Sequence, residues 1–177
     1  MQPPAYVPAD SRAAPTLLLD LLGARLASAR ANAYLYEALT AKRDGRGGFA
    51  GGPTHDELVA MRADEHAHVT LLITAITDLG GEPGLPTPRA AVETQATRGL
   101  TEVIRDPRTL LPAAIDTLVV AELADVEAWS NLIDSAREDG HSALVAKLRA
   151  AHATDLEHLA QLRRWAAASR VLLHAAA

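Results

Sequence analysis

The chain of 177 residues contains no cysteine and few aromatic residues. Without cysteine, disulfides, thiolate metal sites and cysteine nucleophiles are excluded, so any metal ion must bind through oxygen and nitrogen atoms. Aromatic residues make up only 3% of the chain, whereas hydrophobic residues make up 49%. Alanine and leucine dominate the hydrophobic residues, and this favours close-packed helices over a β-sandwich. We therefore predict one all-α domain.

The sequence also lacks a basic block and a long apolar run. The formal net charge is −5 and the longest basic stretch is "AKRDGR", so we expect no nucleic acid partner. No run of about 18 uncharged apolar residues occurs, so we predict no membrane span. The first residues have no basic region, and Asp20 and Arg25 interrupt the apolar run that follows. These features do not fit a secretory signal, and we expect a cytoplasmic protein.

Four long helices are predicted from the hydrophobic periodicity and from the residues that start and stop helices. Residues 1–14 are rich in proline and alanine and predict a flexible tail, and residues 15–175 form the predicted domain. The helices are expected over about 15–42, 54–79, 108–139 and 142–173.

The helix boundaries predict how these helices are connected. Thr54 and Glu57 have the spacing of a capping box, and Asp106 before Pro107 is expected to open the third helix. Short links join the first pair and the second pair, which predicts two antiparallel hairpins. The connector over 80–107, with one short helix around "RAAVETQATRGLTEVI", is long enough to cross back along the bundle. The second and third long helices should therefore run parallel.

Helical geometry indicates which polar residues of the second helix face the core. At about 100° per residue, Glu65 lies at the centre of the apolar stripe, and His68 shares its face one turn on. Asp64 and His66 fall at the edge of the stripe or outside it. The segment "RADEHAH" therefore contributes two inward side chains.

The third and fourth helices repeat this pattern. Glu122 lies on the apolar stripe of the third helix, and Asp155 lies on that of the fourth, with His158 three residues later. An unpaired ionised carboxylate is costly to bury, so these carboxylates must be protonated, paired or bound to a cation. Arg30 is the most obvious basic partner. Two acid-x-x-His pairs and a further carboxylate are what a helical bundle needs to hold two divalent metal ions.

The stretches "ELVAMRADEHAHVTLLITAITDLGGEPGLP" and "AELADVEAW" resemble the second and third helices of the ferritin-like superfamily of di-iron carboxylate proteins. The resemblance covers roughly residues 17–172 and is greatest to the small stand-alone ferritin-like domains of bacteria. It implies a ferritin-like four-helix bundle that binds two iron ions, with manganese as the alternative. It also implies a role for each predicted ligand: Glu65 and Asp155 would bridge the ions, His68 and His158 would be imidazole ligands, and Glu122 would be a terminal ligand.

Two positions depart from the family pattern. Aspartate stands in place of glutamate at Asp155, which shortens the side chain by one methylene. If Tyr36 in the first helix corresponds to Trp129, the position of the expected first-helix glutamate is Ala29. Glu37 is the nearest replacement, although it lies about 60° from the centre of its stripe. Our predicted ligands are thus Glu65, His68, Glu122, Asp155, His158 and Glu37.

Two functions are compatible with these residues. The first is iron handling or iron–oxygen redox chemistry of the di-iron oxidase or ferroxidase type, with metal ions and oxygen or peroxide as partners. The second is a non-catalytic bundle with a degenerate metal site, acting as a stress-related or interaction protein, in which Arg30 could neutralise the carboxylates. Ala29 is the main support for the second. We expect a monomer or a homodimer in either case.

Overall fold

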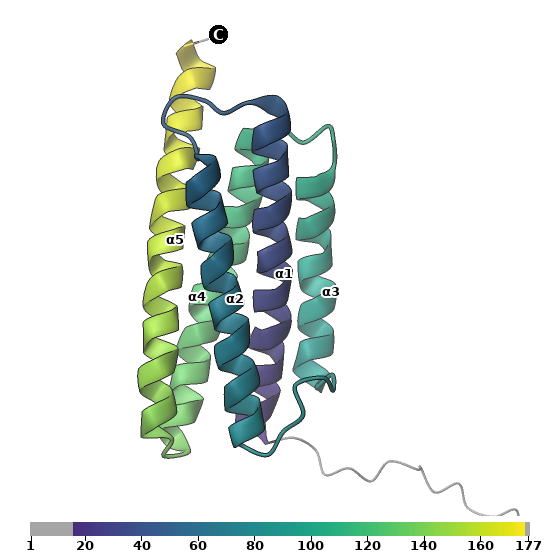
Figure 1. The fold of residues 1–177 in the computed structure, drawn as a ribbon, viewed down its shortest axis with the longest axis vertical. Coiled ribbons are helices and arrows are strands. Elements are labelled where there is room, and N and C mark those ends of the chain that lie inside the picture. Colours follow the sequence, from purple (N-terminus) through teal and green to yellow (C-terminus); the bar gives the residue numbers. More distant parts are fainter. Residues whose placement is uncertain (1–15, 176–177) are drawn as a thin grey trace, which may run out of the picture.

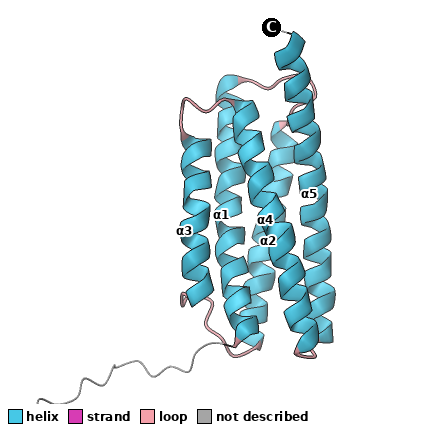
Figure 2. Cartoon of the chain, turned by 180° about the vertical axis from the view of Figure 1, so that it is seen from behind, coloured by secondary structure: helices cyan, strands magenta, loops and turns pink. Residues whose placement is uncertain are grey.

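A computed structural model describes residues 16–175, which form five helices and no strand (Figures 1 and 2). The predicted tail at residues 1–14 lies outside this range, whereas the all-α prediction is confirmed within it. The helices are α1 (Leu17–Arg46), α2 (His55–Asp78), α3 (Pro88–Arg105), α4 (Leu111–Glu138) and α5 (Ser142–Ala175).

The ends of α2 and α4 are fixed by local hydrogen bonds. The capping box at the start of α2 is confirmed: the Thr54 hydroxyl accepts from the Glu57 backbone N–H, and the Glu57 carboxylate accepts from the Thr54 N–H. Each helix is followed, just after its C-cap residue, by a glycine in the left-handed conformation, Gly80 at φ 76° and Gly140 at φ 78°. The chain can turn sharply there because glycine has no Cβ to clash.

The connector between the two hairpins is more ordered than the sequence suggested. Its helix α3 has 18 residues and packs along α1 and α4. At its start, the Arg89 backbone N–H donates to Asp20 of α1 at 2.9 Å. Gly23 of α1 allows this approach, since a Cβ there would lie 2.7 Å from Thr87 Oγ1. The described bundle therefore has five helices: the four long helices that were predicted and the connector helix expected around residues 89–104, which packs as a full member of the bundle.

The start of α4 also differs from the prediction. Asp106 ends α3 instead of opening α4, and its carboxylate accepts from the backbone N–H of Arg108 at 2.8 Å. The prediction that Asp106 opens the next helix was therefore wrong. Helix α4 begins at Leu111, after a residue that makes no side-chain cap.

Two apolar clusters show how the long helices are oriented. One cluster joins the starts of α1 and α5 to the ends of α2 and α4, and the other joins the opposite ends. Helices α2 and α4 therefore run in the same direction, as predicted, and α1 and α5 run against them (Figure 1). The first cluster includes Leu22, Leu72, Leu132 and Leu148, and the second includes Leu39, Leu58, Leu118 and Trp165. A buried polar layer lies between the two clusters.

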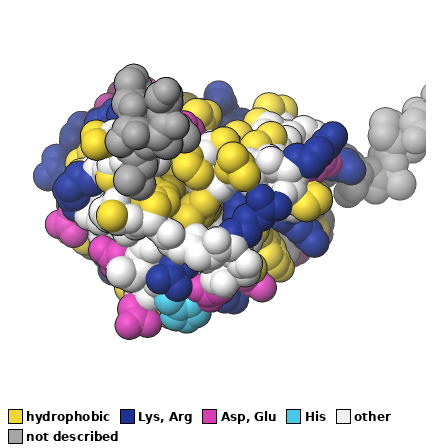
Figure 3. Space-filling model, turned by 90° about the horizontal axis from the view of Figure 1, so that it is seen from above, with side chains coloured by type: hydrophobic (Ala, Val, Ile, Leu, Met, Phe, Trp, Pro, Cys, Tyr) yellow, Lys and Arg dark blue, Asp and Glu magenta, His cyan; other side chains and the backbone are white. Residues whose placement is uncertain are grey.

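The surface is mixed in character where Figure 3 shows it. At that end of the bundle, Lys and Arg side chains alternate with Asp and Glu side chains around a central group of hydrophobic residues. Within residues 16–175, no helix combines the length and the apolar character that crossing a membrane requires.

Candidate metal centre

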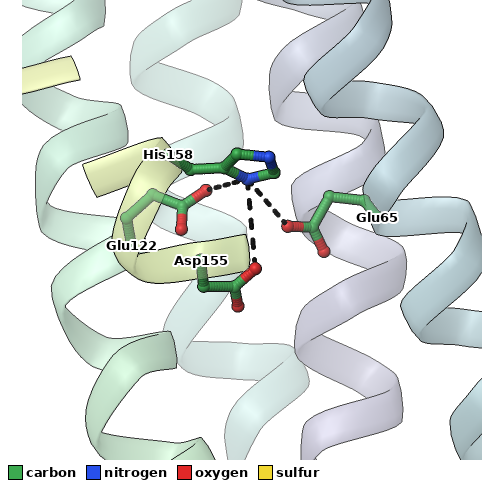
Figure 4. A group of neighbouring side chains, drawn as sticks. All are labelled: Glu65, Glu122, Asp155 and His158. Carbon is green, nitrogen blue, oxygen red and sulfur yellow. Dashed lines mark ion pairs between the residues drawn. The ribbon is translucent and has the colours of Figure 1, made fainter. Parts of the chain in front are cut away.

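The buried polar layer brings together four side chains from three helices. Glu65 comes from α2, Glu122 from α4, and Asp155 and His158 from α5 (Figure 4). Each offers one potential ligand atom, and these atoms all lie within 4.8 Å of one another. The three carboxylates are fully buried and His158 is 5% exposed. This group could hold a metal ion.

His158 lies at the centre of the group. Its Nδ1 atom is 3.8 Å from Glu122 Oε1, 3.9 Å from Asp155 Oδ1 and 4.0 Å from Glu65 Oε1 (Figure 4). His68 lies beside these residues: its Nδ1 is 3.3 Å from Asp155 Oδ1 and 3.6 Å from Glu65 Oε2. We call these five residues the metal-facing group.

Six atoms of this group that could bind a metal ion make no hydrogen bond among the described residues. These atoms are the two carboxylate oxygens of Glu65, Oε2 of Glu122, Oδ1 of Asp155, and Nδ1 of His68 and of His158. Buried polar atoms are nearly always hydrogen-bonded, because an unpaired one loses its hydration without compensation. Six such atoms facing one another are unfavourable in isolation and are well suited to a cation with oxygen and imidazole ligands.

Outer contacts orient three of the ligand side chains. Asp64 lies 3.1 Å from His158 Nε2, so that Nδ1 faces the carboxylates. The Tyr36 hydroxyl donates to Glu122 Oε1 at 2.5 Å, and the Trp129 indole N–H donates to Asp155 Oδ2 at 2.5 Å. Partners of this kind fix the rotamer of a metal ligand and raise its affinity for the ion.

A second group of polar residues fills the rest of the layer. Arg25 is 1% exposed, and its guanidinium donates to Asp125 Oδ1 at 2.8 Å and to Ser28 Oγ at 2.9 Å. Ser28 and Asn32 also donate to the Asp125 carboxylate. We call these four residues the Arg25 network. Arg25 reaches the metal-facing group as well, through a hydrogen bond of 2.9 Å to Asp155 Oδ2.

Burial changes the ionisation of the carboxyl groups. Desolvation raises the pKa of Glu65 well above its ordinary value, and the charge of Asp155 raises it further. Desolvation likewise raises the pKa of Glu122, against the contacts with His158 and Tyr36, which lower it. These acids hold protons more tightly than exposed acids do, unless a cation compensates their charge.

The two histidines respond in opposite ways. Burial lowers the pKa of His68 below its ordinary value. Burial also acts to lower the pKa of His158, but the carboxylates of Glu122, Asp64 and Asp155 outweigh it and raise this pKa to about 9. In the metal-free protein, His158 is therefore the protonated partner of the carboxylates at neutral pH.

The structure places most of the predicted site residues in one group, with one correction. Glu65, His68, Glu122, Asp155 and His158 meet in the core, as described above. Glu37 does not: its side chain is 54% exposed and pairs with Arg62 at 3.2 Å. The inclusion of Glu37 among the ligands was therefore wrong, because its position on the shoulder of the α1 stripe turns it towards solvent. Ala29 is fully buried in an apolar cluster.

The basic partner of the carboxylates was also assigned to the wrong arginine. Arg30 is exposed, whereas Arg25 lies in the core. The helical angles contain this signal, since Arg25 is four residues before Ala29 and only about 40° from it. Asp125 was missed as well, although it follows Glu122 by three residues, the spacing that singled out His68 and His158. Asp64 was placed at the edge of its helix, and its contact with His158 needed the position of α5.

The residues of the metal-facing group indicate which kind of metal ion the group could bind. Its composition of three carboxylates and two imidazoles is suited to a divalent transition metal. Comparisons with family models, with curated proteins and with solved structures find no match for this chain.

Proposed function

We propose that this chain is a metal-binding protein that holds a divalent transition metal ion in the bundle core, with iron as the leading ion and manganese as the alternative. The observation that carries the proposal is the convergence of six buried potential ligand atoms that make no hydrogen bond among the described residues. Neutral imidazoles and carboxylates are ligands that Fe(II) and Mn(II) accept readily, and the absence of cysteine removes the competing thiolate chemistry.

The side chains around the centre support this role. Asp64 holds the His158 ring so that Nδ1 points inward, and Tyr36 and Trp129 each donate to a carboxylate ligand from the apolar side. The two apolar clusters above and below the layer exclude water from it. A bound iron ion would supply one-electron exchange with oxygen or peroxide, and the protein would hold it in a site protected from water.

Two features support a ferritin-like bundle as the fold of this proposal. The two hairpins are joined by a long connector that makes α2 and α4 parallel, and the acid-x-x-His pairs lie at the middle of α2 and α5. Iron handling is the function that such a bundle and such a centre favour together. Asp155, in place of glutamate, and Ala29 are the departures from that family's pattern.

The Arg25 network favours a second candidate, a non-catalytic bundle with a degenerate site. In that case Arg25 would compensate part of the carboxylate charge and the remaining acids would stay protonated. This candidate predicts a protein that binds no metal ion tightly.

Metal content separates the two candidates. The purified chain is stripped with a chelator and reloaded anaerobically with Fe(II) or Mn(II), and the bound metal is measured by elemental analysis. We expect at least stoichiometric metal in the wild type and at least tenfold less bound metal in Glu65→Ala and Asp155→Ala. Glu157→Ala is the matched control, because Glu157 lies on α5 two residues from Asp155 but is exposed.

Metal that stays sub-stoichiometric, or that is unchanged in Glu65→Ala and Asp155→Ala, would contradict metal binding at this centre. A measurement of oxygen uptake after Fe(II) is added then distinguishes iron oxidation from simple binding. In iron oxidation, four Fe(II) ions give four electrons to one oxygen molecule, which takes up four protons to form two water molecules. Fe(II) that is bound without oxygen uptake would limit the function to binding.

A further inference from the structure

Arg25 is a buried cation that lies directly beside the metal-facing group. Its guanidinium connects Asp155 Oδ2 and Asp125 Oδ1 at 2.9 and 2.8 Å. It stacks over the Trp129 ring, with 4.5 Å between the guanidinium carbon and the ring centroid. The side chain is 1% exposed, so its charge is not screened by solvent. An arginine keeps this charge at every pH that the protein tolerates.

The two carboxylate oxygens of Asp155 face different sides, one towards the metal-facing group and the other towards Arg25. Its Oδ1 atom has no hydrogen-bond partner and faces the metal-facing group. Its Oδ2 atom accepts from Arg25 and Trp129. A carboxylate that bridges two metal ions gives one oxygen to each; here one oxygen is open to an ion and the other is held by a guanidinium.

Asp125 has no oxygen open to a metal ion. Arg25 and Ser28 donate to its Oδ1 atom, and Asn32 donates to its Oδ2 atom. To bind an ion, this carboxylate would have to give up hydrogen bonds to Arg25, Ser28 or Asn32 in the buried layer. Asp125 is thus a partner of Arg25, although it lies one turn from Glu122.

The His68 side of the centre offers few donors to a second ion. His68 Nδ1 faces Glu65 Oε2 and Asp155 Oδ1, and Asp155 Oδ1 also belongs to the group around His158. A divalent transition metal needs about four ligands or more. Within the described residues, helix α1 supplies no carboxylate to the centre; it presents Arg25 and the buried Ala29.

We propose that the centre binds one metal ion, held by Glu65, Glu122, Asp155 and His158, and that the guanidinium of Arg25 takes the place of the second ion. This inference rests on the proposed metal-binding function and specifies its stoichiometry. The charges agree with it: one divalent ion and one guanidinium together offset three of the four buried carboxylates. A second divalent ion would have to bind next to the fixed positive charge of Arg25.

The test is the number of Mn(II) ions bound per chain, counted by equilibrium dialysis and checked by electron paramagnetic resonance. The metal-stripped full-length protein is titrated to saturation at neutral pH. We expect one ion per chain and the spectrum of an isolated Mn(II) ion. Two ions per chain with the spectrum of a coupled pair would overturn the inference and leave the proposed function intact. No bound ion would overturn both.

Variants of Arg25 test its role in setting this number. Arg25→Glu and Arg25→Gln remove the fixed charge and free Asp125, so we expect both to bind two ions per chain. Arg25→Lys keeps the charge, and Arg30→Gln changes an exposed arginine of the same helix; both should still bind one ion. Circular dichroism shows which variants are folded, and the wild-type count decides the stoichiometry whether or not they fold. Folded Arg25→Glu and Arg25→Gln proteins that bind a single ion would overturn the role of Arg25.

Discussion

The metal-facing group and the Arg25 network lie side by side in one buried layer, but their polar atoms are satisfied in opposite ways. In the Arg25 network, both oxygens of Asp125 accept hydrogen bonds, from an arginine, a serine and an asparagine. In the metal-facing group, six donor atoms have no hydrogen-bond partner among the described residues. The Arg25 network contains a permanent cation, whereas the metal-facing group depends on protonated His158 or on a metal ion from solution.

This difference explains why a buried acid alone does not identify a metal site. Asp125 and Glu122 lie one turn apart on α4 and are both buried. Arg25 reaches Asp125 and makes it part of a closed network, whereas Glu122 keeps one unpartnered oxygen that faces the centre. Substitutions that exchange these two states test the comparison directly.

The largest effect is expected from removing the internal cation. Arg25→Met leaves Asp125 and Asp155 without their buried partner, so we expect the free energy of unfolding of the metal-free protein to fall by about 3 to 5 kcal/mol. Denaturant unfolding measures this change. Arg30→Met is the control, and at an exposed site it should change stability by about 0.5 kcal/mol or less. A loss below about 1 kcal/mol in Arg25→Met would mean that Arg25 does not compensate these charges.

The next largest effect, that of Glu65→Gln on stability, should have opposite signs in the metal-free and the metal-bound protein. Glu65→Gln replaces a buried acid of raised pKa with a neutral isostere, so we expect the metal-free protein to gain about 1 to 3 kcal/mol of stability. The same variant should lose the stabilisation by metal, which in the wild type is about 2.7 kcal/mol at a free concentration one hundred times the Kd. Thermal unfolding with and without Mn(II) tests both parts, with Glu157→Gln as the exposed control. An unchanged metal response would contradict ligation by Glu65.

A smaller effect is expected from pH, through His158. Its pKa is raised from 6.5 to about 9, so its protonated form stabilises the fold fully below 6.5 and this stabilisation is lost as pH rises through 9. We expect the metal-free protein to lose about 2 kcal/mol over this range. Saturating metal should remove this slope, because the bound ion keeps the imidazole deprotonated over the whole range and no proton is released on unfolding. His158→Gln should flatten the metal-free profile, and an unaltered slope in this variant would assign the pH dependence to another group.

The smallest effect is expected from Asp64, which touches His158 but not the carboxylates. Asp64→Asn should weaken metal binding by about tenfold, because the His158 ring loses its charged partner at Nε2. Stability of the metal-free fold should change by less than about 1 kcal/mol, since Asp64 is half exposed. Isothermal titration compares this variant with Asp78→Asn, an exposed aspartate of the same helix. Equal metal affinities in the two variants would show that Asp64 does not support metal binding through His158.

Much of the bundle could be predicted because the spacing of apolar residues within one helix shows which face of that helix is buried. The positions of Glu65, Glu122 and Asp155 follow from the apolar residues three and four positions away, and the start of α2 follows from Thr54 and Glu57. Such signals are local, and the structure agrees with them. The packing of helix α3 was underestimated because its buried face is narrow and contains only three buried residues, Ala90, Thr97 and Ile104.

The partners of the buried acids could not be predicted in the same way, because each partnership depends on two helices. Arg25 meets Asp125 and Asp155, which are 100 and 130 residues away in the chain. The angular position of Arg25 on α1 shows that it points inward, but not which carboxylates it reaches. The prediction of Glu37 as a ligand was wrong for a related reason. We expected helix α1 to contribute an acid to the centre, whereas the buried charged residue of α1 is a base, Arg25.

The central claim is that a metal ion binds between Glu65, Glu122, Asp155 and His158. The most direct measurement is a crystal structure of the Mn(II)-loaded protein with anomalous diffraction data collected at the manganese absorption edge. We expect one anomalous peak in the buried layer, within about 2.0 to 2.3 Å of the donor atoms of these four residues. A centre without a peak, or peaks confined to surface carboxylates, would contradict it.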